Sequence, residues 1–258
     1  MNESSNWKRD APLVIAHRGA SAYAPENTLA AFREAVNLNA DAIELDAKLL
    51  NDGTVVVLHD TTLNRTTSVT GSIYRFTYSE IKRLDAGSHF SGQFSSECIP
   101  TLNEVFEMFG GDILINVELT NYVRPWDGLS REVIKLIQQY HLESQVLLSS
   151  FNPWALVLAK RLDSMIPRAL LVHPGEVGLI RTLFKKIVDY MAYHPHHSLV
   201  SKKLMTEAKT KRKKVNVWTV NNREEMIKLL KLGVDGLITD FPDIARNVMI
   251  QQKAIDEM

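Results

Sequence analysis

The sequence predicts an α/β protein folded as a (β/α)8 barrel. Short apolar runs rich in β-branched residues alternate along the chain with segments of helical periodicity, which is the arrangement of a parallel sheet covered by helices. There are eight such runs, the number that closes a barrel, and the 258 residues suit a fold that commonly needs about 250. We expect the strands at Leu13–His17, Ala42–Asp46, Ile113–Glu118, Val146–Ser150, Ala169–Val172, Val188–Tyr193, Val215–Val220 and Gly236–Thr239.

Capping residues mark the predicted helices between these strands. Asn27 or Thr28 precedes a segment whose apolar residues fall on one face, so either side chain can cap that helix. Two further helices start with capping-box spacing and have a glycine placed to end them. These pairs and glycines are Thr101 with Glu104, Asn222 with Glu225, Gly110 and Gly233.

The regular alternation is interrupted after the second strand. Residues Lys48–Asp60 form a predicted antiparallel hairpin around Asp52-Gly53. If these two residues are the loop, Asp46 lies opposite His59, and the hairpin returns His59 to the mouth of the barrel. Residues Thr61–Pro100 are rich in Thr, Ser and Gly, and we expect them to cross the top face rather than form a separate domain.

Composition favours a small-molecule partner. Lys plus Arg and Asp plus Glu both number 30, so the protein has no net positive charge that would attract nucleic acid or an anionic membrane. Cys98 is the only cysteine, which excludes an intrachain disulfide. The segment Met1–Pro12 lacks the apolar core of a signal peptide, and no stretch approaches the roughly 18 apolar residues of a membrane span. We therefore expect a cytoplasmic protein without integral membrane contact, of unknown oligomeric state.

Acidic residues gather at the predicted strand ends. Glu44 and Asp46 are two apart on one strand, so both side chains project to the same face, which in a barrel can be the interior. Glu118 ends the neighbouring strand and adds a third carboxylate. Three hard oxygen ligands suit one divalent cation, Mg²⁺ or Ca²⁺, better than zinc, which prefers nitrogen and sulfur. A single acid of this kind would more often form a structural ion pair.

Two histidines and an arginine accompany these acids. His17 and His59 end the first strand and the hairpin, and imidazole is suited to proton transfer near neutral pH. The planar guanidinium of Arg18 can hold two phosphate oxygens, a combination that points to phosphoryl transfer. The structural alternative for Arg18 is a salt bridge to Glu26 or another acid at the barrel mouth.

Other candidates carry weaker signals. Trp218, in the seventh strand, provides either an apolar pocket wall for a substrate or simple core packing, and Phe151 is a weaker case of the same kind. We interpret the histidine-containing segment 193–197 as an ordinary polar loop rather than as a second metal site. We interpret the basic residues Lys209 and 211–214 as a solvated helix end rather than as a contact with lipid or nucleic acid.

Several short motifs together resemble the glycerophosphodiester phosphodiesterase family, in an order and spacing that cover nearly the whole chain. They are Ala16-His17-Arg18-Gly19, Pro25-Glu26-Asn27-Thr28, Glu44-Leu45-Asp46, His59-Asp60, Leu63-Asn64-Arg65-Thr66-Thr67, Ile99-Pro100-Thr101-Leu102, Val217-Trp218-Thr219-Val220-Asn221 and Gly233-Val234-Asp235-Gly236-Leu237-Ile238-Thr239-Asp240.

The resemblance implies a single TIM-barrel domain over 1–258, with an insertion at about 48–100. It implies a divalent cation on Glu44, Asp46 and Glu118, and His17 and His59 as the acid/base pair. It also favours the pocket for Trp218. The expected reaction is metal-dependent hydrolysis of a small glycerophosphodiester to a glycerol phosphate and an alcohol.

One position departs from the family pattern. Many members have a lysine two residues after the third acid, where this chain has Thr120, so a positive phosphate contact is missing. Thr120 can donate a hydrogen bond but supplies no charge. Two alternatives therefore stay open, a phosphodiesterase acting on lysophospholipid and a non-catalytic phosphodiester-binding protein.

Overall fold

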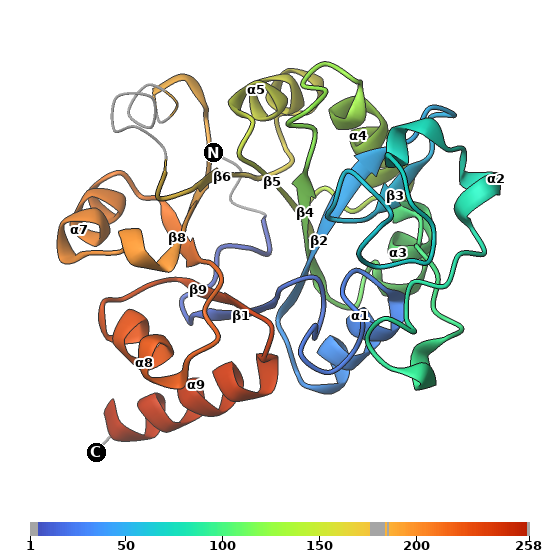
Figure 1. Ribbon diagram of the computed structural model, residues 1–258. Coiled ribbons are helices and arrows are strands. Elements are labelled where there is room, and N and C mark those ends of the chain that lie inside the picture. The colour runs from blue at the N-terminus through green and yellow to red at the C-terminus, as the bar shows by residue number, and fades with distance from the viewer. Residues whose placement is uncertain (1–4, 176–183, 185, 257–258) are drawn as a thin grey trace.

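Eight parallel strands close into a barrel with helices outside them, which confirms the predicted TIM-barrel architecture (Figure 1). The computed structural model describes residues 5–175, 184 and 186–256. The sheet order is β1-β9-β8-β7-β6-β5-β4-β2-β3, and a pairing of β1 with β2 closes the ring. One additional strand, β3, pairs antiparallel with the extended end of β2 and lies outside the ring.

The strands lie close to their predicted positions, except the one predicted at Val188–Tyr193. Their bounds are β1 Leu13–Ala16, β2 Ala42–Leu49, β3 Val55–Val57, β4 Leu114–Leu119, β5 Val146–Ser150, β6 Arg168–Val172, β7 Ala192–Pro195, β8 Lys214–Val217 and β9 Gly236–Thr239. The α-helices are α1 Leu29–Asn37, α2 Tyr78–Ile81, α3 Leu102–Phe109, α4 Leu129–Gln139, α5 Pro153–Leu162, α7 Lys202–Thr210, α8 Arg223–Lys231 and α9 Pro242–Asp256, and the 3-10 turns are η1 Ile73–Arg75, η2 Gly92–Phe94 and η3 His197–Leu199.

Capping explains where several helices start. Thr28, rather than Asn27, caps α1 through its hydroxyl, which accepts a hydrogen bond from the Ala31 amide. Thr101 and Glu104 form the predicted capping box of α3. The Asn222 side chain accepts hydrogen bonds from the amides of the first turn of α8. Each cap satisfies backbone donors that the first helical turn leaves free.

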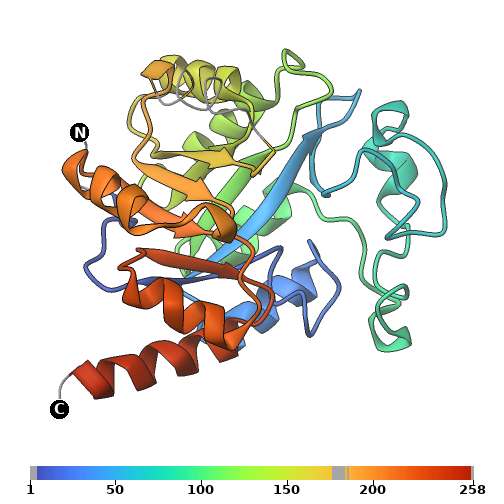
Figure 2. The ribbon, with the colours of Figure 1, turned by 60° about the vertical axis from the view of Figure 1, so that its left-hand side comes forward.

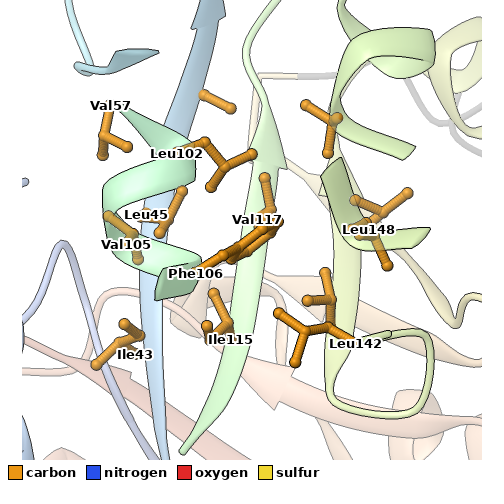
Figure 3. Close-up of a cluster of buried hydrophobic side chains, with 14 of the residues drawn as sticks. Ile43, Leu45, Val57, Leu102, Val105, Phe106, Ile115, Val117, Leu142 and Leu148 are labelled. Atoms are coloured by element: carbon orange, nitrogen blue, oxygen red, sulfur yellow. The ribbon is translucent and has the colours of Figure 1, made fainter. Parts of the chain in front are cut away.

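The barrel wall separates two kinds of core. Outside, α3 packs over β2 and β4, where apolar side chains such as Leu45, Phe106 and Val117 meet (Figure 3). Inside, an apolar layer seals the amino-terminal end of the barrel, and Ile15, Ala42 and Ile238 belong to it. Because side chains alternate along a strand, the inward positions nearer the carboxyl ends are free to carry polar groups.

The hairpin register differs from the expected one by one residue. Ala47 pairs with Val57, and the Leu58 amide donates to the Asp46 carbonyl, so Asp46 lies opposite Leu58 rather than His59. The physical reason is a longer loop: the Leu50 amide donates to the Thr54 carbonyl, which leaves three loop residues ending in Gly53 at φ +85°.

The strand predicted at Val188–Tyr193 is wrong, because β7 starts only at Ala192 and ends at Pro195. Val188 and Tyr190 belong to an apolar cluster with β6, outside any strand. Pairing with β6 instead reaches His194 and Pro195, which are buried although their residue types suggest a loop. The expectation of a polar loop over 193–197 was thus wrong for these two residues.

Residues 61–100 carry a small apolar core of their own, which includes Leu63, Ile73, Ile81 and Ile99. In Figure 2 this segment, coloured teal to green, lies beside the barrel at the end toward which the strands point, away from both chain ends. It also shares apolar contacts with the hairpin through Val56. In the described part of the chain, no helix is long and apolar enough to cross a membrane.

Candidate active site

Three carboxylates meet inside the barrel near the carboxyl ends of β2 and β4. Glu44 and Asp46 both project inward from β2, and Asp46 stands directly beside Glu118 of β4 in the sheet register. One carboxylate oxygen from each residue lies within 4.8 Å of the others. The sequence thus predicted correctly that these three acids come together, and their arrangement could hold one metal ion.

Burial makes this concentration of negative charge costly. Glu44 and Asp46 are only 3% and 1% exposed. Burial and then the charge of Asp46 raise the pKa of Glu118 to about 8, against the opposing influence of the Tyr122 hydroxyl and the Arg18 charge. Burial likewise raises the pKa of Glu44, and the charges of Asp46 and Glu118 add to that effect. A cation in contact with all three would relieve both penalties.

Each candidate catalytic histidine is paired with an aspartate. His17 Nδ1 lies 2.7 Å from Asp240 Oδ1. His59 Nδ1 lies 2.8 Å from Asp60 Oδ1. An ionised carboxylate only accepts hydrogen bonds, so it favours the tautomer with the proton on Nδ1 and leaves Nε2 for proton exchange.

The surroundings of Asp240 fix its position. Ser21 Oγ and Asn221 Nδ2 also donate to its carboxylate, at 2.9 and 2.5 Å. Burial alone would raise the pKa of Asp240, but the hydrogen bond and charge of His17 outweigh burial and lower it. Asp240 therefore remains ionised beside His17 at neutral pH.

Arg18 forms the salt bridge to Glu26 that its sequence allowed, and it also lies beside the acidic cluster. Its guanidinium lies 2.9 Å from Glu26 Oε1 and 3.3 Å from Asp46 Oδ2, while its amide donates to Glu44 Oε2 at 2.9 Å. The positive φ of 55° at Arg18 turns the chain there, just after β1. Backbone and side chain of Arg18 thus both face the acidic cluster.

A chain of ion pairs continues from Arg18 to His59. Arg65 binds Glu26 at 2.6 Å and Asp60 at 2.8 Å, and Asp60 in turn contacts His59. Burial alone would raise the pKa of Glu26, but the hydrogen bonds of Arg65 and the charge of Arg18 lower it to about 2. This network connects the two histidine-bearing loops of the mouth.

Trp218 lies at the same place as the acids. It lines a small cavity of about 30 Å³ together with His17, Glu44 and Glu118. Its indole nitrogen donates to the His194 carbonyl at 2.8 Å, and its ring meets Phe151 edge-on at a centroid distance of 5.4 Å. His59 is not among the residues that line this cavity, and its side chain is 43% exposed at the rim.

Thr120 is not free to bind a phosphate. Its hydroxyl donates to the Ala47 carbonyl at 2.6 Å and accepts a hydrogen bond from Lys48 Nζ at 2.8 Å. The single hydroxyl proton is therefore already donated within the barrel wall. A basic side chain is nevertheless present near Thr120, because the buried amino group of Lys48 lies beside it.

Sequence reasoning assigned no part in this site to Asn27, Lys48, Arg65 or Asp240. Asn27 holds Asp46 from two sides: its amide donates to Oδ2 at 2.9 Å, and its oxygen accepts from the Asp46 backbone at 3.2 Å. Asn27, Arg65 and Asp240 belong to motifs shared with the family, so those motifs could have indicated that the three residues lie in the site. For Lys48, only its alternation with Glu44 and Asp46 could have suggested an inward side chain.

Known proteins share this fold and its motifs. A model of the glycerophosphoryl diester phosphodiesterase family matches residues 17–244. A glycerophosphodiester phosphodiesterase of Caldanaerobacter subterraneus subsp. tengcongensis is 41% identical over 238 residues, which cover 92% of this chain and 97% of that protein. A glycerophosphodiester phosphodiesterase of Bacillus altitudinis is 35% identical over 93% of this chain and 99% of its own length.

Solved structures agree with this result. The structure of an Oleispira antarctica phosphodiesterase in complex with the product sn-glycerol-3-phosphate matches with a TM-score of 0.80 and 34% sequence identity, over 93% of this chain and 97% of that one. The family match covers most of the chain, and the relatives are similar over nearly their whole length. The chain therefore belongs to the glycerophosphoryl diester phosphodiesterase family and is an enzyme of that class.

Proposed function

We propose that this enzyme hydrolyses small glycerophosphodiesters to a glycerol phosphate and an alcohol, within one domain that spans 1–258 and includes the insertion at about 48–100. The observation that supports this most directly is the meeting of three buried carboxylates with the His17–Asp240 pair at one barrel mouth. Paired acids and an oriented histidine are the groups that phosphodiester hydrolysis needs.

Glu44, Asp46 and Glu118 would hold one divalent cation, Mg²⁺ or Ca²⁺. Their donors are all carboxylate oxygens, and their mutual repulsion within the buried site is the kind that a hard cation offsets. When bound, such an ion supplies charge stabilisation to a phosphodiester under attack. In the proposal, Arg18 holds phosphate oxygens and Trp218 forms the apolar wall beside the glycerol or headgroup.

His17 and His59 are the proposed acid/base pair. One imidazole removes a proton from the attacking hydroxyl as its oxygen bonds to phosphorus, and the other protonates the alcohol oxygen as its bond to phosphorus breaks. The attacking hydroxyl belongs either to water or to the neighbouring glycerol hydroxyl. Phosphorus NMR of early products separates these routes, because only the second gives a cyclic phosphate.

The first test is turnover of glycerophosphocholine by protein stripped of metal with a chelator. We expect no release of glycerol phosphate until Mg²⁺ or Ca²⁺ is restored. We also expect His17→Ala to lose activity on the order of 10²–10⁴-fold, the range of general acid/base catalysis. Metal-independent turnover would refute the cation site. Binding without turnover of any glycerophosphodiester would support a non-catalytic phosphodiester-binding protein.

A second candidate substrate is lysophospholipid. Phe151 contacts both Trp218 and Tyr122 edge-on, at centroid distances of 5.4 and 5.8 Å, so an aromatic row leads outward from the cavity. Tyr122, the outer member of this row, is 42% exposed. An acyl chain could lie along these rings. Faster turnover of lysophosphatidylcholine than of glycerophosphocholine would favour this candidate.

A further inference from the structure

Lys48 is a buried cation at the candidate active site. Its side chain is only 2% exposed and projects inward from β2, two positions beyond Asp46 and four beyond Glu44. Nζ donates to Thr120 Oγ1 at 2.8 Å and makes a longer contact of 3.4 Å with the Thr120 carbonyl. Since an unpaired ammonium group in the protein interior is unfavourable, this placement requires compensation.

The compensation comes from the carboxylates of the site. Lys48 lies two residues beyond Asp46 on β2, beside Thr120, which lies two residues beyond Glu118, so its amino group is in the row next to the paired Asp46 and Glu118. Its two hydrogen bonds in the described part of the chain go only to uncharged oxygens of Thr120. An ammonium has three N–H donors, so Thr120 positions the group without neutralising it.

The position of Lys48 complements that of Arg18. Arg18 follows β1, which borders β2 on one side, whereas the Lys48 ammonium leans toward β4 on the other side. The acidic cluster therefore has one basic side chain on each flank.

We propose that Lys48 is the second phosphate-binding cation of this enzyme, held in place by Thr120 and acting together with Arg18 on the anionic group of the substrate. This inference rests on the proposed function. Because phosphate charge is most exposed as the diester is attacked, a preorganised ammonium stabilises that state in a site that water leaves. Thr120 is a positioning residue, because its hydroxyl has no free proton for the substrate.

The principal test is Lys48→Met, which removes the charge and keeps a long apolar side chain. We expect kcat/KM to fall on the order of 100-fold, as for loss of one preorganised donor. The inhibition constant of sn-glycerol 3-phosphate should rise in parallel. Mg²⁺ and Ca²⁺, titrated by calorimetry, should bind as tightly as before or more tightly, because a neighbouring positive charge has been removed.

A charge exchange separates this role from simple packing. Lys48→Met with Thr120→Lys returns an ammonium from β4 to the same location, and we expect at least a tenfold recovery of kcat/KM over Lys48→Met. Lys48→Arg keeps the charge and should retain more activity than Lys48→Met. Lys214→Met is the matched control, since Lys214 binds Asp235 at the opposite end of the barrel, and it should behave as wild type.

Three results would overturn the proposal: wild-type kcat/KM in Lys48→Met, an unchanged inhibition constant, or no recovery in the exchanged variant when thermal unfolding shows it folded. If Lys48→Met does not fold, the exchanged variant and Lys48→Arg still test whether activity follows the charge. A wild-type enzyme without turnover would instead count against the proposed function, and calorimetric binding of sn-glycerol 3-phosphate would then still test Lys48.

Discussion

The hydrogen bond between His17 and Asp240 gives the candidate site its best-defined proton-transfer group. The two residues are 223 positions apart in the sequence, yet their side-chain atoms lie 2.7 Å apart. Asp240 is held by Ser21 and Asn221 as well, so its orientation does not depend on His17 alone. The pair fixes both the direction of the imidazole and the nitrogen that carries its proton.

Asp240→Asn tests this arrangement, because the amide keeps the size of the side chain but removes its charge. We expect kcat to fall on the order of 10²–10⁴-fold, since the imidazole loses its preferred tautomer. The unfolding midpoint should change little in comparison. Steady-state kinetics beside urea unfolding measure both, and Asp243→Asn, at an exposed contact with Tyr23, is the control. A kcat within threefold of wild type would exclude a positioning role for Asp240.

At the scale of elements, the turn between β1 and α1 places Arg18 against the acidic cluster. Gly19 has φ +83°, and a Cβ built on it would lie 2.6 Å from the Ala31 carbonyl carbon. The Ala20 amide donates to the Ala31 carbonyl at 2.9 Å, which holds this turn against the start of α1. Only glycine allows both the positive φ and this close approach of two backbones.

Gly19→Ala should therefore destabilise the protein and lower its activity. Backbone strain and the clash together should cost more than the roughly 1–3 kcal/mol expected of a strained conformation alone. Gly53→Ala is the matched control: Gly53 has nearly the same φ, +85°, but nothing lies within 4 Å of its added Cβ. Urea unfolding gives both losses. Equal losses would show that φ, rather than contact with α1, decides the effect.

The same elements show how far local sequence patterns reach. Strand alternation placed Glu44, Asp46 and Glu118 together correctly, because that prediction needs only the two-residue period and the adjacency of strands. The hairpin register failed because Asp52-Gly53 fits a loop of either two or three residues, and the sequence does not distinguish them. The Lys48 contact was missed because it depends on which side chain β4 presents beside it.

At the scale of the whole molecule, barrel closure brings the first and last strands of the chain together at one site. The pairing of β1 with β9 aligns Ala16 with Thr239, so that the residues just beyond each strand, His17 and Asp240, become neighbours. No local pattern in a sequence reports such a pairing. The predicted barrel architecture indicates that the strand ends lie close together. Which side chains form hydrogen bonds there could be read only from the structure.

The interior of the barrel also contains a buried histidine, His194, which should make stability depend on pH. The ring is fully buried, and Nε2 lies 3.0 Å from the Asn216 amide nitrogen, an arrangement in which Nε2 accepts and the ring is neutral. Burial lowers the pKa of His194 to about 3. In the unfolded chain a histidine has a pKa of about 6.5, so between these values only the unfolded state takes up the proton.

Acid should therefore weaken the fold through His194 by about 1.4 kcal/mol for each pH unit below about 6.5. Glu118 acts in the opposite direction, because its raised pKa of about 8 lets the folded state hold a proton that the unfolded state releases. The contribution of His194 is thus isolated by comparison with His194→Gln, which keeps an acceptor for Asn216 and does not titrate. Urea unfolding of both proteins from pH 7 to 4.5 should show wild type losing stability relative to the variant as pH falls. A difference in stability that does not vary with pH would mean that His194 is protonated in the folded barrel.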